Sequence, residues 1–336
     1  MAVIATGFFD GVHLGHRRVV EALVSFARRT GGEAVVVTFA QHPRAVLQQD
    51  ARSLRLLTSA EEKEAMLYEL GVDRVETLPF DRAFARLTAS EYIYDVLIGR
   101  FDADGLVLGY DNRFGSDRLT PDRIAPLAES LGLEVQVVPP VVIGAVETAA
   151  ASENRSHPRL RKREGPADEV SGRGPASPDV FGGWLPRNEA GTTGVVVSST
   201  KIREALDKGD VETADAMLGY AYTLRGVVVG GKQLGRTLGF PTANLRLYDP
   251  LKMIPARGVY LTEVEVSGQR FWGMTNVGDI IETNIFDFHE DIYGLDLRLH
   301  FKKRLRDGKR FENLEGLKAQ LAADEAVCRA LLAGKA

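Results

Sequence analysis

Short apolar runs alternate with amphipathic segments along the first part of this 336-residue chain, and that alternation limits the folds open to it. The runs of strand length are Ala2–Thr6, Ala34–Phe39, Arg74–Leu78, Gly105–Leu108 and Glu134–Val138. Between them, Arg17–Arg29 has helical spacing, Ser59 and Glu62 form a capping-box pattern that opens 59–69, and Thr120-Pro121 marks another helix start. Strands that alternate with helices predict a Rossmann-like α/β domain with a parallel sheet wrapped on both faces.

This alternation of strand and helix patterns is interrupted at residues 149–192. The stretch from Ala151 to Ala190 is crowded with Gly, Pro, Ser, Arg and Glu and shows no period. Because such a composition cannot bury enough apolar surface to offset the entropy of ordering, we expect a flexible insertion. Its basic run, Arg159–Arg163, is followed by several acids, which favours a solvated loop over a polyanion site.

After Thr223 the pattern changes to a period of two. Apolar side chains alternate with polar ones at Leu295, Leu297, Leu299 and Phe301, and again at Val264 and Val266. Several such runs separated by Gly-containing turns predict a small antiparallel β-barrel. The tail, Asn313–Leu332, predicts a terminal amphipathic helix with an apolar side formed by Leu314, Leu317, Leu321 and Val327. The length favours two domains, and we place them at 1–220 and 221–336.

The overall composition is that of an ordinary globular protein, with 44% hydrophobic and 26% charged residues and a formal net charge of −4. This balance indicates neither a nucleic-acid binder nor a membrane-surface binder. The single cysteine, Cys328, can form no intramolecular disulfide and is expected to be a small packing residue. With no apolar run near the ~20 residues of a membrane span, and Met1–Thr6 leading directly into a glycine turn, we expect a cytoplasmic protein.

The ten residues from Gly7 to His16, GFFDGVHLGH, fall where the first expected strand ends and the first helix begins. Unpaired N–H groups and the helix dipole make this position suitable for an anion. The glycines, Gly7, Gly11 and Gly15, allow close approach of the backbone to a ligand. His13 and His16 can both face the helix mouth and donate hydrogen bonds to a phosphate as charge builds in a transition state. The loop predicts a phosphoryl- or nucleotidyl-transfer site.

Three further patches follow expected strands or open a helix. They are Thr38–Arg44 with His42, Leu108–Gly115 with Asp111, Asn112 and Phe114, and Val197–Arg203 with Ser199, Thr200 and Arg203. Because the carboxyl ends of parallel strands form the ligand edge of such a sheet, we expect all of them near the first loop. Each patch also has a plainer interpretation as a cap or turn, and for Ser199 the alternative is a helix cap.

A glycine-rich arch spans Gly226–Leu245 and lacks the spacing of a Walker loop. Within it, Thr242 and Asn244 stand two residues apart, so on an extended strand their oxygens point to one face, as Mg²⁺ ligands would. Glu282 lies in an apolar strand-like run, where a carboxylate can take the proton of a substrate hydroxyl. The alternative for Glu282 is an ordinary outward-facing glutamate.

With these residues the chain resembles the bacterial bifunctional riboflavin kinase/FMN adenylyltransferase (FAD synthetase) family. The first half looks like an HxGH nucleotidyltransferase domain. The resemblance implies that His13 and His16 contact ATP phosphates, that His42 lies near the reacting phosphates, and that Asp111, Asn112 and Phe114 line the nucleotide or flavin side. It further implies nucleotide or phosphate contacts for a larger set: Gly7, Phe9, Asp10, Gly11, Gly15, Ser199, Thr200, Arg203, Gly235 and Asn276.

Residues 223–325 resemble the riboflavin kinase half of the same family, most specifically in Gly235–Asn244. By this resemblance, Thr242 and Asn244 bind Mg–ATP, and Glu282 is the general base for the ribityl hydroxyl. Riboflavin, FMN and ATP would then be the substrates, FAD the final product and Mg²⁺ the cofactor. No protein partner is indicated.

Two positions depart from the family pattern. Gln41 stands where the family often has the first proline of Pro-His-Pro, which we interpret as a tuning change. Asp279-Ile280 leads directly to Glu282 where the family usually carries an Arg-Pro-Thr segment, so either the turn is tightened or the kinase half is impaired. Two alternatives therefore stay open: an FMN adenylyltransferase alone, and a non-catalytic flavin-binding regulatory protein.

Overall fold

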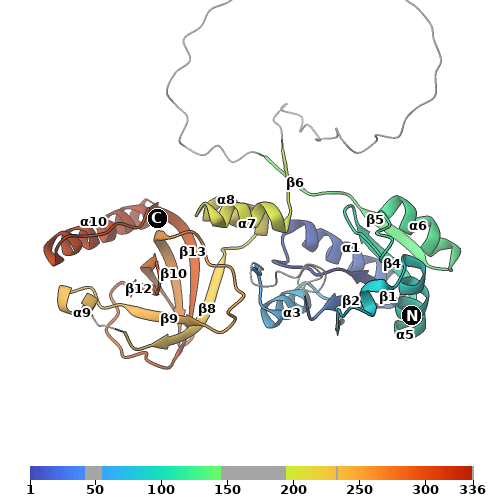
Figure 1. The fold of residues 1–336 in the computed structure, drawn as a ribbon, viewed down its shortest axis with the longest axis horizontal. Helices are drawn as coiled ribbons and strands as arrows, with labels where there is room; N and C mark the ends of the chain where they lie inside the picture. The colour runs from blue at the N-terminus through green and yellow to red at the C-terminus, as the bar shows by residue number, and fades with distance from the viewer. Residues whose placement is uncertain (42–54, 145–193, 232–233, 335–336) are drawn as a thin grey trace, which may run out of the picture. The chain divides into compact units, whose positions relative to one another are not determined.

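The computed structural model describes residues 1–41, 55–144, 194–231 and 234–334 (Figure 1). His42 and the expected insertion at 149–192 lie outside these residues. By the density of internal contacts the chain divides into two compact units, 1–141 with 196–336, and 142–195. The predicted boundary at 220/221 falls inside the larger unit and stays a prediction. Strands β6 (Val142–Ile143) and β7 (Val195–Val196) form a two-stranded sheet.

A five-stranded sheet forms the first half of the larger unit, in the order β3-β2-β1-β4-β5, with every neighbouring pair parallel. The strands are β1 (Ala2–Thr6), β2 (Glu33–Phe39), β3 (Arg74–Leu78), β4 (Ala103–Gly109) and β5 (Glu134–Val138). The predicted parallel sheet is confirmed.

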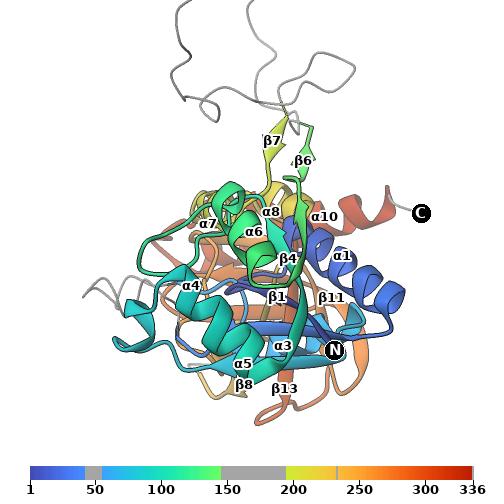
Figure 2. The ribbon, with the colours of Figure 1, turned by 90° about the vertical axis from the view of Figure 1, so that its right-hand side faces the viewer.

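Helices cover both faces of this sheet (Figure 2). Ala2 and Ile4 of β1 point into one apolar cluster, and Val3 and Ala5 point into another, because successive strand residues face opposite sides. The second cluster is closed by α1 (Leu14–Thr30) and α3 (Ala60–Glu69). The first is closed by α4 (Ala89–Glu91), a π-helical stretch Tyr92–Ile98, α5 (Gly99–Phe101) and α6 (Pro121–Ser130).

The expected helix starts are present. Ser59 and Glu62 form the capping box of α3. Thr120 is the N-cap of α6 with Pro121 as its first residue, but the Thr120 hydroxyl bonds the Asp122 carboxylate and caps no backbone N–H. Two more helices follow the second unit, α7 (Ser199–Asp207) and α8 (Val211–Leu218).

The second half is a closed antiparallel barrel in the order β10-β11-β12-β9-β8-β13, which confirms the predicted fold. Its strands are β8 (Thr223–Val229), β9 (Ala243–Leu247), β10 (Gly258–Val266), β11 (Gln269–Val277), β12 (Ile281–Ile285) and β13 (Asp296–Arg306). A short helix, α9 (Leu234–Leu238), lies within the glycine-rich arch. None of the described helices is long and apolar enough to cross a bilayer.

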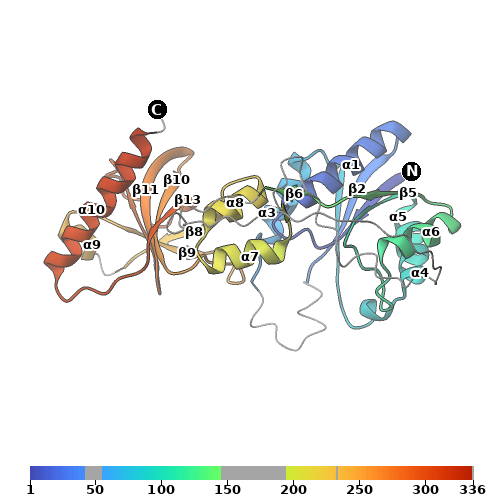
Figure 3. The ribbon, with the colours of Figure 1, turned by 90° about the horizontal axis from the view of Figure 1, so that it is seen from above.

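The terminal helix, α10 (Leu314–Ala333), packs on the outside of the barrel (Figure 3). It does so through Leu321, Cys328 and Leu332, which pack with Val259, Leu261 and Met274. Cys328 is a buried free thiol, in agreement with its expected packing role. The predicted apolar side is wrong at Leu314 and Val327, which are 51% and 50% exposed. Val327 is one residue from Cys328 and so lies about 100° around the helix from the packed stripe.

Candidate active sites

The loop between β1 and α1 holds a strained backbone. Phe9 and Val12 have φ of 53° and 35°, in the left-handed region that side chains disfavour, and Gly11 has φ of 82°. Three of its groups are held from outside: the Asp10 carboxylate, the Gly11 N–H and the Gly11 carbonyl. Strain of this kind is typical of functional loops, where the surrounding contacts hold the backbone in place.

His13 is the N-cap residue of α1, and its Nδ1 accepts a hydrogen bond from the backbone N–H of His16 at 3.3 Å. A ring nitrogen that accepts carries no proton, so in the neutral ring the proton of His13 is on Nε2. The capping contact therefore fixes the tautomer and leaves Nε2–H as the donor.

The rings of His13 and His16 stack with their centroids 3.6 Å apart. Burial lowers the pKa of His13 to about 4, and the Arg203 charge acts in the same direction. Burial also lowers the pKa of His16 well below its usual value, with further contributions from His13 and Lys63. Both rings are therefore neutral at pH 7. His16 Nδ1 is buried and has no hydrogen-bond partner within the described part of the chain.

Both histidines line a cavity of about 280 Å³ at the carboxyl ends of the strands. The structure brings together there a further set of the residues singled out by sequence: Gly7, Phe9, Gly15, Asp111 and Asn112. Burial raises the pKa of the Asp111 carboxyl. The carboxyl end of β2 and the loops that follow β1, β4 and β5 contribute to the lining, which is the arrangement expected for a ligand site in a parallel sheet.

A second cavity, of about 600 Å³, shares lining residues with the first, among them Gly7 and Asn112. Its wall is aromatic and contains Phe39, Phe80, Phe84, Tyr92 and Phe114. Most of these rings meet edge to face, with centroids about 5.3 to 5.6 Å apart. Of the five, the sequence analysis singled out Phe114, for the nucleotide or flavin side. The spaced aromatic residues after β3 were the available signal for Phe80, Phe84 and Tyr92.

Asn112 lies where the two cavities meet. Its Oδ1 accepts a hydrogen bond from the N–H of Gly109, and its Nδ2 donates to the carbonyl of Thr6 at 3.2 Å. Thr6 in turn shares a 2.7 Å hydrogen bond with the Tyr92 hydroxyl. Asn112 therefore ties the ends of β1 and β4 together between the two cavities.

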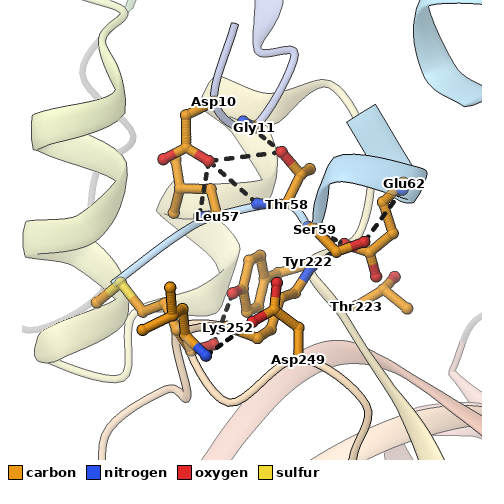
Figure 4. Close-up of polar contacts among 12 residues, drawn as sticks. Asp10, Gly11, Leu57, Thr58, Ser59, Glu62, Tyr222, Thr223, Asp249 and Lys252 are labelled. Atoms are coloured by element: carbon orange, nitrogen blue, oxygen red, sulfur yellow. Dashed lines mark hydrogen bonds and ion pairs between the residues drawn. The ribbon is translucent and has the colours of Figure 1, made fainter. Parts of the chain in front are cut away.

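The Asp10 carboxylate is 3% exposed and holds the segment that precedes α3 (Figure 4). Its Oδ1 accepts hydrogen bonds from the N–H groups of Leu57 at 2.9 Å and Thr58 at 3.2 Å, and the Gly11 N–H donates to the Thr58 hydroxyl. Burial raises the pKa of Asp10, against the opposing charge of Arg203. Asp10 and Gly11 are thus fixed by contacts behind the loop and do not line the 280 Å³ cavity.

Three residues expected to hold the triphosphate lie at the start of α7. Arg203 forms an ion pair with Asp10, and the Ser199 hydroxyl donates to the Asp10 carbonyl at 3.0 Å. Thr200 is exposed. None of the three lines the 280 Å³ cavity. The alternative that Ser199 caps the helix is wrong, because the N-cap is Ser198, whose hydroxyl accepts from the Lys201 N–H.

Residues 251–253 hold the same segment on its other side (Figure 4). Leu56 donates its N–H to the Leu251 carbonyl and accepts from the Met253 N–H, both at 2.8 Å. Lys252, which is 6% exposed, forms an ion pair with Glu62 of α3. Sequence reasoning missed this contact, because nothing local in the sequence links residues so far apart.

In the barrel, strand pairing aligns three of the expected kinase residues. Glu282 of β12 is the register partner of Asn276 on β11 and of Asn244 on β9, so the three side chains leave the same face of the sheet. Asn244 is 7% exposed, and its Oδ1 has no hydrogen-bond partner among the residues that the structure describes. A buried oxygen without a partner can coordinate a cation or accept a hydrogen bond from a ligand N–H.

Thr242 lines a separate cavity of about 450 Å³, together with Arg236, Pro241 and the segment Phe288–Tyr293. Two glycines of the arch approach this region closely. A Cβ on Gly231 would collide with the Asn244 amide, and one on Gly235 would collide with the Phe240 carbonyl. Gly235 therefore requires glycine, because its neighbour is backbone, whereas a side chain at position 231 would displace the Asn244 amide.

The turn after Gly278 is tight. The Gly278 N–H donates to the Ile280 carbonyl at 3.2 Å, and β12 begins at the next residue. Glu282 nevertheless stays opposite Asn276. The expected tightened turn is therefore present.

Both halves of the chain match known protein families. Residues 1–151 match the model of the FAD synthetase family, and residues 218–332 match that of riboflavin kinase. Proteins described as bifunctional riboflavin kinase/FMN adenylyltransferase match nearly the whole chain. The one from Listeria monocytogenes is 31% identical over 98% of this chain and 92% of its own length, and the one from Escherichia coli K12 is 32% identical over 97% and 91%.

Among solved structures, a crystal structure from Streptococcus pneumoniae superimposes with a TM-score of 0.76 at 31% identity. The match covers 98% of this chain and 94% of that one, which is described as a macrolide-efflux protein. The likeness extends the shared fold over both halves.

Proposed function

The chain belongs to the family of bifunctional riboflavin kinase/FMN adenylyltransferases, and from that membership we infer that it phosphorylates riboflavin to FMN and adenylylates FMN to FAD. One observation gives the strongest support to the second activity, the adenylylation of FMN. Two stacked, neutral imidazoles face the 280 Å³ cavity, which adjoins a larger aromatic one. Such a pair of cavities suits a nucleotide on one side and a flavin ring on the other.

We propose that ATP occupies the 280 Å³ cavity and the flavin ring of FMN the aromatic cavity. A phosphate oxygen of FMN then forms a bond to the α-phosphorus of ATP, while the bond to the bridging oxygen breaks and pyrophosphate leaves. His13 donates from Nε2 to the phosphate oxygens as their charge grows, and His16 supplies a second neutral donor. No side chain of the protein forms a covalent bond in this step, so positioning of the substrates and stabilisation of charge suffice.

The start of α7 adjoins the 280 Å³ cavity, because Val197 lines it. Thr200 is exposed and is proposed to bind the triphosphate together with Ser199. The ion pair between Arg203 and Asp10 supports a positioning role for Arg203, because Asp10 belongs to the loop that carries His13. His42 stays a proposed neighbour of the reacting phosphates.

For the kinase half, we propose that Glu282 accepts the proton of the ribityl 5′-hydroxyl as its oxygen attacks the γ-phosphorus of ATP and ADP leaves. Asn244 and Thr242 are proposed to hold Mg²⁺, with Gly235 and Asn276 beside the nucleotide. The unsatisfied, buried Oδ1 of Asn244 supports this assignment, since an amide oxygen is a ligand that Mg²⁺ accepts. When bound, the cation would neutralise phosphate charge.

The test incubates the purified chain with riboflavin, ATP and Mg²⁺ and separates the flavins by chromatography over time. The proposal predicts that FMN appears first and FAD follows. A reaction that stops at FMN would exclude the adenylyltransferase activity. Conversion of added FMN to FAD with riboflavin left unchanged would exclude the kinase activity.

A further inference from the structure

Lys63 is a buried lysine with no part in the proposed adenylyl-transfer steps. It lies on α3 and is 5% exposed. Its ammonium donates hydrogen bonds to the Thr38 hydroxyl at 2.9 Å and to the Phe8 carbonyl at 3.2 Å. It also lies 4.4 Å from the centroid of the Phe8 ring, a cation–π contact. The ammonium therefore joins α3 to the ends of both β1 and β2.

No ion pair neutralises this charge within the described ranges, which distinguishes Lys63 from the other buried lysine, Lys252. The charged groups that act on Lys63 are Asp10 behind the loop and the exposed Glu64 on its own helix. Burial is the largest effect and lowers the pKa of Lys63 to about 8. A buried ammonium with only neutral hydrogen-bond partners is costly to keep, and a bound anion reduces that cost.

The ammonium lies behind the loop whose front faces the 280 Å³ cavity. Its partner Phe8 lines that cavity, and so do the neighbours on either side, Gly7 and Phe9. Phe39, next to Thr38, lines it as well. The charge of Lys63 reaches His16, whose pKa it lowers. Positive charge in this low-dielectric setting attracts an anion in the cavity.

We propose that Lys63 is a positioning residue for adenylyl transfer, which holds the Phe8 backbone and supplies the positive charge that draws the nucleotide phosphates onto the loop. The inference rests on the proposed adenylyltransferase function. It differs from that function in its test, because wild-type protein that makes no FAD refutes the function, whereas the variants below refute only the role of Lys63.

The experiment compares Lys63→Met and Lys63→Arg with wild type in the full chain, using FMN, ATP and Mg²⁺. For Lys63→Met we expect kcat/KM for ATP to fall at least about 30-fold, because one charge that favours the phosphates is lost. Lys63→Arg should keep at least about a third of the wild-type value, because the charge is retained. Lys303→Met is the matched control and should change nothing, since Lys303 of β13 forms an exposed ion pair with Glu212 of α8.

The pH profile separates this role from a merely structural one. In wild type, kcat/KM for ATP reports the free protein and should fall as the pH rises through about 8, where Lys63 loses its proton. Arginine stays charged, so in Lys63→Arg this alkaline fall should disappear. The riboflavin kinase activity of the same preparations should stay within about twofold of wild type, which serves as an internal check of folding.

Two results would overturn the proposal. One is a folded Lys63→Met protein with kcat/KM for ATP within about threefold of wild type. The other is an alkaline limb in Lys63→Arg that coincides with that of wild type. Should Lys63→Met fail to fold, the second result alone decides.

Discussion

The imidazole rings of His13 and His16 stack with centroids 3.6 Å apart and planes inclined by 16°. Two charged rings would repel at this distance, so the stack excludes a state in which both rings carry a proton charge. The capping hydrogen bond from the His16 N–H to His13 Nδ1 also requires an unprotonated nitrogen. Protonation of His13 at Nδ1 therefore breaks the capping contact, and the loop geometry depends on pH.

The first prediction concerns acid stability. The unfolded chain takes up a proton on His13 near pH 6.5, and the folded chain does so only near pH 4. Between these values the unfolded state binds more protons, so the free energy of unfolding falls as the pH falls, by at most about 1.4 kcal/mol per pH unit for this group. His13→Asn keeps a good N-cap and removes the titration. Urea unfolding from pH 7 to pH 4.5 should show a shallower decline in this variant, and parallel curves would contradict the prediction.

The contribution of Asp215 to stability should depend on pH in the opposite direction to that of His13. Burial raises the pKa of its carboxyl to about 7, while the unfolded value is 3.8. Between these values the folded state binds more protons, so the contribution of Asp215 to stability falls as the pH rises toward 7. An asparagine can still accept the 2.7 Å hydrogen bond from the Tyr222 N–H. We expect the Tm of Asp215→Asn, relative to wild type, to rise between pH 4 and 7 and to level off above. A pH-independent difference would count against it.

The contact between Lys252 and Glu62 predicts an asymmetric effect on stability. Lys252→Met leaves the Glu62 carboxylate without its cation at a partly buried site, which should cost about 3 kcal/mol in urea unfolding. Adding Glu62→Gln should recover part of this loss, since glutamine can still bond the Ser59 N–H. The surface control Lys303→Met should cost at most about 0.5 kcal/mol. Equal losses in the two lysine variants would refute the assignment.

Asn244 predicts a specific change in metal dependence. With its Oδ1 removed in Asn244→Ala, the Mg²⁺ concentration for half-maximal riboflavin kinase activity should rise at least about tenfold. FAD formation from added FMN should keep its wild-type dependence on Mg²⁺, because the substitution lies in the barrel. A lower maximal rate with unchanged Mg²⁺ dependence would argue against metal binding at Asn244.

Local patterns in the sequence predicted much of the fold. The bounds of β1, β3 and β5 agree with the predicted segments, because each is defined by its own apolar pattern. The glycine and histidine loop was recognisable for the same reason, since its residues are contiguous. The terminal helix was predicted as an element, but its packed side depended on the barrel beneath it.

Contacts between distant segments were not predictable. The alignment of Asn244, Glu282 and Asn276 is set by strand register, which no single segment encodes. Lys63 stands among glutamates, in a charged run that is typical of a solvent-exposed helix face. Its burial follows only from the way α3 packs against the ends of β1 and β2.

The central claim is that two separate sites act in sequence, one built on His13 and His16 and the other on Glu282. It is tested most directly by mixing two variants that are each blocked at one site. With riboflavin, ATP and Mg²⁺, His16→Ala should form FMN alone, Glu282→Gln should form neither FMN nor FAD, and an equal mixture of the two should form FAD through FMN released into solution. If either variant alone makes FAD from riboflavin at the wild-type rate, or if the mixture makes none, the account is contradicted.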